Sequence, residues 1–134
     1  MNKFASDLFE IVSGSQSKLQ EITEVDFVYK KSPDKWSKKE ILGHLVDSAI
    51  NNYQRFMNAE DQGNLIFNGY NQVDWVQRND YQNRNTSEIV DLFVSANTHI
   101  VRLLCNISDF QIDKESYDHN FDTICMQTLS KGKL

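Results

Sequence analysis

The chain has 134 residues, 40% of them hydrophobic and 25% charged, which predicts one globular domain over residues 1–134 and argues against wholesale disorder. Its net charge of −5 argues against nucleic-acid binding, because phosphate contacts need clustered Lys and Arg. The two short basic pairs, Lys30–Lys31 and Lys38–Lys39, are expected on solvated turns and helix surface. No stretch approaches the ~18–20 apolar residues of a membrane helix, and an early charge argues against a signal peptide, so we expect a cytoplasmic protein with no membrane partner.

The first predicted helix covers residues 4–25. Its apolar residues recur at helical spacing, and Gly14 weakens its middle. Residues 27–33 are expected to form a connector, because the residue before Pro33 is disfavoured in a helix.

The second predicted helix has the clearest start signal in the chain. Ser37 and Glu40 form a capping box, and Trp36 before it can pack onto Ile41 as a hydrophobic staple. A wide apolar stripe follows, and the helix is expected to end at residues 61–63.

Residues 64–85 are irregular and combine aromatic with polar side chains. We expect a loop packed onto the bundle, with a short helix at residues 73–78. A ligand pocket under this loop, at Tyr70, Trp75 and Tyr81, is an alternative to simple packing.

A third helix is predicted over residues 86–104, followed by a polar loop over residues 106–119. Apolar residues at 121, 124, 125 and 129 indicate the first two turns of a fourth helix, which stops at residue 130. The two cysteines, Cys105 and Cys125, lie among apolar residues and are expected to be buried free thiols.

The candidate chemistry centres on His44. On the second helix, polar residues recur at intervals of three and four and form an edge beside the apolar stripe. This edge fits either the rim of an enclosed site or a solvent face with ordinary charge pairs. Asp47, next to it, can orient a ligand of such a site. The edge consists of Glu40, His44, Ser48, Asn51 and Arg55.

No second metal signature is present, since the sequence holds neither an H-x-x-x-H nor an H-E-x-x-H motif. The chain has three histidines, and a site built from His44, His99 and His119 is a further alternative.

Residues 33–56, PDKWSKKEILGHLVDSAINNYQRF, resemble the second-helix motif of the DinB-like superfamily, closest to its bacillithiol-transferase type, formerly called metal-dependent hydrolases. Residues 69–76, GYNQVDWV, resemble the family's next loop, and residues 95–104, SANTHIVRLL, its third helix. The similarity covers about residues 5–120.

The resemblance implies an all-α, up-down-down-up helical bundle that forms a homodimer. It also implies a zinc or nickel ion held by three histidines, the first of which matches His44. The family's other two ligands form an H-x-x-x-H pair on the fourth helix, and this sequence has no such pair. We therefore expect a short or truncated fourth helix and an incomplete metal site. We also expect that a partner subunit covers the exposed apolar seam, or that the tail packs there in another way.

Two functions remain open. The first is a metal-dependent thiol S-transferase or hydrolase acting on a small-molecule thiol or electrophile, with His44 as metal ligand, Asp47 and Asn51 beside it, and Arg55 as an anion contact. The second is a non-catalytic helical module for dimerisation or ligand binding.

Overall fold

The computed structural model describes residues 3–62 and 69–106, and every regular element in these two ranges is helical. The expected all-α class is therefore confirmed. The elements are α1 (Lys3–Gln20), α2 (Glu24–Val28), α3 (Lys38–Gln62), α4 (Gln72–Asn79), the 3₁₀ turn η1 (Tyr81–Asn83) and α5 (Thr86–Asn106).

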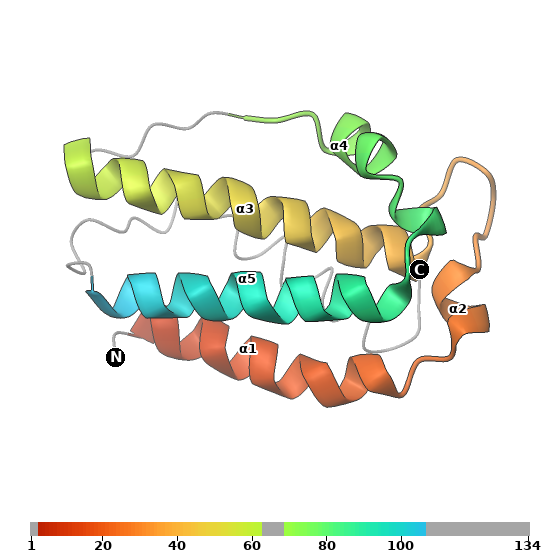
Figure 1. The fold of residues 1–134 in the computed structure, drawn as a ribbon, viewed down its shortest axis with the longest axis horizontal. Helices are drawn as coiled ribbons and strands as arrows, with labels where there is room; N and C mark the ends of the chain where they lie inside the picture. The colour runs from red at the N-terminus through yellow and green to blue at the C-terminus, as the bar shows by residue number, and fades with distance from the viewer. Residues whose placement is uncertain (1–2, 63–68, 107–134) are drawn as a thin grey trace.

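Three long helices lie side by side and form the body of the molecule (Figure 1). α5 packs against both α1 and α3. α1 runs in one direction, and α3 and α5 both run in the opposite one, which is the up-down-down part of the expected order. The expected loop after α5 and the expected fourth helix at residues 121–129 lie outside the described residues.

The core consists of two clusters between these helices. At the end near α2, one cluster joins Leu19, Phe27, Leu42, Leu45, Val46, Val76, Tyr81, Ile89 and Phe93. The other joins Ala5, Leu8, Val12, Ala49, Phe56, Ile100, Val101 and Leu104. Their members recur at helical spacing along α1, α3 and α5, as the apolar periodicity predicts.

The expected bounds of the first helix are wrong at its C-terminal end, because α1 stops at Gln20 and a separate helix, α2, begins at Glu24. Thr23 starts the second helix: its hydroxyl accepts a hydrogen bond from the backbone N–H of Asp26, at 3.2 Å. Phe27, expected in a connector, is buried in the core instead.

The N-terminus of α3 has the predicted capping box. The Ser37 hydroxyl accepts from the Glu40 N–H at 3.1 Å, and the Glu40 carboxylate accepts from the Ser37 N–H at 3.1 Å. Trp36 and Ile41 pack against the same core cluster. α3 ends at Gln62, within the expected range.

The expected short helix in the aromatic segment is confirmed as α4. The Asn71 side chain caps it by accepting from the Asp74 N–H at 3.0 Å. Tyr81 is buried against α3, and the half-buried rings of Tyr70 and Trp75 stack with their centroids 4.3 Å apart. These aromatic side chains therefore pack onto the bundle.

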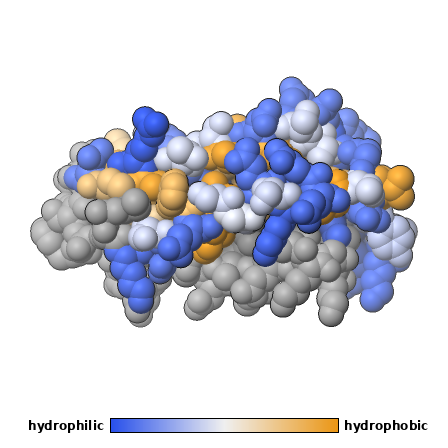
Figure 2. Space-filling view, turned by 90° about the horizontal axis from the view of Figure 1, so that it is seen from below, coloured by the Kyte–Doolittle hydropathy of each residue, from blue (hydrophilic) through white to orange (hydrophobic). Residues whose placement is uncertain are grey.

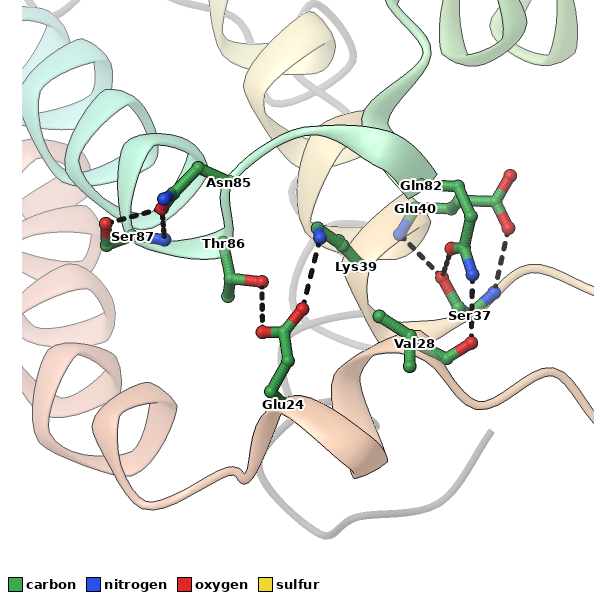
Figure 3. A network of polar contacts seen from close by, with 9 residues as sticks. All are labelled: Glu24, Val28, Ser37, Lys39, Glu40, Gln82, Asn85, Thr86 and Ser87. Carbon is green, nitrogen blue, oxygen red and sulfur yellow. Dashed lines mark hydrogen bonds and ion pairs between the residues drawn. The ribbon is translucent and has the colours of Figure 1, made fainter.

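The expectation that Lys38 and Lys39 are solvated is wrong, since both are buried. α2 folds back toward the start of α3 and brings Glu24 within 3.3 Å of the Lys39 ammonium (Figure 3). Lys30 likewise pairs with Glu40 at 3.0 Å. The basic residues join the short helix and its connector to α3.

Two further expectations concern the molecular surface. Cys105 is a free thiol, but it is exposed at the end of α5 rather than buried, and Cys125 lies outside the described residues. Figure 2 shows hydrophobic patches bordered by hydrophilic side chains on the face seen from below. Among the described helices, none is long and apolar enough to cross a membrane.

Candidate functional site

The predicted polar edge of α3 is buried over most of its length. His44, Asp47, Ser48 and Asn51 are each at most 7% exposed. Their spacing of three and four residues places them on one side of the helix. The interpretation of this edge as a solvent face is therefore wrong, and the edge lines an enclosed polar cluster. We call His44, Asp47, Ser48 and Asn51 the α3 polar cluster.

Asp47 is held by two side chains that follow it in the sequence by about thirty residues. Its Oδ1 accepts from the Tyr81 hydroxyl at 2.7 Å and from the Asn79 amide at 3.2 Å. The second oxygen, Oδ2, is buried and has no hydrogen-bond partner among the described residues. Only one side of the carboxyl group is thus satisfied by α4 and η1.

Gly43 explains how Tyr81 reaches this carboxylate. A Cβ atom at Gly43 would lie 2.1 Å from the Tyr81 ring, closer than any real contact. The missing side chain lets the ring lie directly on the α3 backbone. The ring then extends along the helix to Asp47, one turn later.

Burial raises the pKa of the Asp47 carboxyl, because the charged form loses its hydration. The hydrogen bond from Tyr81 and the more distant Arg84 charge oppose this rise, and so does the bond from Asn79. The pKa of the Tyr81 phenol is raised in turn, first by its own burial and then by its bond to Asp47. The pair therefore keeps its proton on the phenol oxygen.

His44 is fully buried, with its ring centroid 5.2 Å from that of Trp36. Further along α3, the Asn51 side-chain nitrogen is buried without a hydrogen-bond partner among the described residues. The Arg55 guanidinium donates to the Asn52 side-chain oxygen at 3.2 Å. The expected site residues His44, Asp47, Asn51 and Arg55 thus follow one another along a single helix.

His99 is not brought to this cluster. It is exposed on α5, and its ring stacks on Tyr53 with the centroids 4.8 Å apart. Tyr53 follows His44 by nine residues, a separation of about 13 Å along the helix axis. One ion cannot span that separation, and His119 lies outside the described residues.

The expected metal site can be compared with the side chains that the structure brings together. A catalytic zinc site uses three protein ligands and an open position for water or substrate. Among the described residues, no group of three His, Cys, Asp or Glu side chains is arranged to hold a metal ion. The α3 polar cluster supplies one imidazole and one carboxylate, so these residues alone do not fit a catalytic metal.

The sequence does not indicate Asn79 as a site residue, and it indicates Tyr81 only as a packing aromatic or as part of a pocket under its loop. The sequence feature that could have indicated the close approach of Tyr81 is Gly43. A glycine inside a helix costs about 1 kcal/mol relative to alanine, and its placement there marks a close approach by another group.

No family model matches this chain, and no curated protein does. A search of solved structures finds YfiT from Bacillus subtilis, described as a probable metal-dependent hydrolase with an unusual four-helix bundle topology. The match covers 98% of this chain and 82% of YfiT with a TM-score of 0.67, at 15% sequence identity. The chain has the YfiT fold. At this identity the likeness shows the four-helix bundle fold alone, and the chemistry of YfiT is not transferred by it.

Proposed function

We propose that this chain is a DinB-like bundle protein related to metal-dependent hydrolases and thiol S-transferases, with its functional centre at the α3 polar cluster. One observation carries the proposal: Asp47 Oδ2 and Asn51 Nδ2 are buried on the same side of α3 as His44 and have no hydrogen-bond partner among the described residues. Buried polar atoms are normally paired, so such a group of atoms favours a bound polar ligand.

The solved structure with the same fold, YfiT, is described as a probable metal-dependent hydrolase, which supports a hydrolase role. The thiol S-transferase role, and His44 as the first ligand of a zinc or nickel ion, rest on the sequence resemblance alone. That role needs two more ligands than the α3 polar cluster supplies, either from residues outside the described ranges or from a second copy of the chain. His44, Asp47 and Asn51 are proposed as contacts of a small polar ligand, and Arg55 as the contact for an anionic group on it.

The second candidate is a non-catalytic module for ligand binding or dimerisation. The separation of His99 from His44 favours it, because the His99 ring stacks on Tyr53 in another part of the bundle. A homodimeric state and a cytoplasmic location remain predictions under either candidate.

The deciding experiment is elemental analysis of untagged protein purified after growth with zinc or nickel. Near-stoichiometric metal that is lost in His44→Ala but kept in His99→Ala would support the metal-dependent candidate. Absence of metal from all three proteins would overturn it and leave the non-catalytic module. Circular dichroism of each variant checks that the bundle is folded.

A further inference from the structure

A second candidate site lies at the end of the bundle where α2 meets the other helices. It is a pocket of about 560 Å³ between the C-terminal end of α1, α2, the start of α3 and the start of α5. Its volume falls in the range of small-molecule sites, about 300–1,000 Å³. Apolar side chains that line it come from three helices and their connections: Leu19, Ile22, Phe27 and Val90.

Two of the charged residues that line this pocket, Glu24 and Lys39, are already paired with each other. The Glu24 carboxylate accepts from the Thr86 hydroxyl at 2.6 Å and from the Lys39 ammonium at 3.3 Å (Figure 3). The Thr86 bond lowers the pKa of Glu24, with Lys39 acting in the same direction, so the carboxylate stays charged. Lys39 is therefore neutralised and is not available to a ligand at low cost.

The other two charges that line the pocket are opposite in sign and have no ion-pair partner among the described residues. Arg84 is half-buried, with its guanidinium carbon 5.2 Å from the centroid of the Tyr81 ring, which fixes it at the wall by a cation–π contact. Asp91 lies on the second turn of α5 and is exposed. Within the part of the chain that the structure describes, the pocket thus presents one cation and one anion that form no ion pair, together with an apolar lining.

We propose that this pocket binds a small zwitterion with an apolar group, either a free amino acid or a short peptide. Its carboxylate pairs with Arg84, whose planar guanidinium suits a carboxylate. Its ammonium group pairs with Asp91. The apolar group lies against Leu19 and Val90, where it loses contact with water.

This site is separate from the α3 polar cluster, and the proposal does not depend on the cluster's function. Arg84 lies on the ring of Tyr81, and the hydroxyl of the same ring reaches Asp47. Tyr81 therefore contacts a residue of each site, and the two sites share no ligand-contacting residue.

The test is to titrate the protein with L-leucine and with leucyl-leucine, and to measure binding by NMR chemical shifts and by calorimetry. Two matched probes each lack one charge: 4-methylpentanoate has no ammonium group and isoamylamine has no carboxylate. Leucine or leucyl-leucine should bind about tenfold more tightly than 4-methylpentanoate or isoamylamine. A change in affinity of about tenfold is the effect expected from losing one charge-assisted hydrogen bond. Whichever of the two zwitterions binds more tightly shows whether the pocket prefers a free amino acid or a short peptide.

Arg84→Gln and Asp91→Asn should each weaken zwitterion binding about tenfold, for the same reason. Arg102→Gln and Glu88→Gln change exposed charges of α5 that do not line the pocket, and should leave binding unchanged. Failure of both zwitterions to bind at millimolar concentration would overturn the proposal. Equal binding of 4-methylpentanoate, or no effect of the Arg84 and Asp91 variants, would also overturn it.

Discussion

The hydroxyl of Tyr81 donates a 2.7 Å hydrogen bond to Oδ1 of Asp47, and both side chains are at most 2% exposed. The bond ties η1 to the middle of α3. It leaves the second carboxylate oxygen without a hydrogen-bond partner among the described residues, and the helical spacing places Asp47 on the same side of α3 as His44 and Asn51. The geometry of the α3 polar cluster therefore depends on a residue from another part of the chain.

Gly43→Ala should destabilise the protein. Alanine would normally stabilise a helix interior by about 1 kcal/mol, but here its Cβ would lie 2.1 Å from the Tyr81 ring. Moving that ring away from α3 is an overpacking change, and we expect a net loss of about 1–3 kcal/mol in unfolding free energy, measured by urea denaturation.

Gly14→Ala is the matched control, because Gly14 is exposed on α1 and a Cβ there would meet no atom within 4 Å. It should raise the unfolding free energy by about 0.5–1 kcal/mol. If both variants gain stability alike, the close approach of Tyr81 to α3 is wrong.

Asp47→Asn should flatten the pH dependence of stability. A carboxyl group whose pKa is raised in the folded state binds more protons there than in the unfolded state. Stability therefore falls as the pH rises from about 4, the ordinary value, through the raised pKa. Asparagine keeps an oxygen acceptor for Tyr81 but carries no charge, so this decline should disappear. Urea denaturation at a series of pH values measures it, and an unchanged slope in the variant would contradict the assignment.

Tyr81→Phe tests the same bond from the other side. It leaves the buried Asp47 without its shortest hydrogen bond, which should cost about 1–3 kcal/mol at neutral pH. Since that bond lowers the pKa of Asp47, its loss should also steepen the decline in stability with pH. Tyr29→Phe, at an exposed tyrosine, should have little effect on either measurement.

Much of the bundle can be predicted from the sequence because its determinants are local. The capping box at Ser37 fixes the start of α3, and the helical spacing of apolar residues identifies the three long helices. α2 is harder to predict, since its five residues are too few to show a period and its start depends on the side chain of Thr23.

The candidate site is harder to predict because its determinants are distant. The spacing of His44, Asp47 and Asn51 places them on one side of a helix, but whether that side is buried depends on Tyr81 and Asn79. The separation of His99 from His44 likewise follows from how α5 lies along α3, which no local pattern records.

Ser37→Ala should destabilise the start of α3. It removes the acceptor of the Glu40 N–H, which typically costs about 1 kcal/mol, and also the contact of the hydroxyl with Gln82. Ser95→Ala, on the exposed side of α5, controls for the loss of a hydroxyl. Urea denaturation should place Ser37→Ala clearly below Ser95→Ala, and equal stabilities would show that the capping box contributes little.

The predicted homodimer can be tested at two exposed apolar side chains on the surface of α3. Ile50 and Met57 are 42% and 39% exposed and lie seven residues apart, on the same side of the helix. Covering such side chains with a second copy removes apolar area from water, which favours association. We therefore expect the native protein to sediment as a dimer at low micromolar concentration.

The double variant Ile50→Glu with Met57→Glu should sediment as a monomer, because a two-fold interface would bring the new carboxylates of both copies together. Val25→Glu changes a residue of α2 that is 76% exposed and should remain dimeric. A folded native monomer would contradict the predicted dimer. A dimer that persists in the double variant would place the interface on a different face, such as that of α1, where Phe9 is 50% exposed.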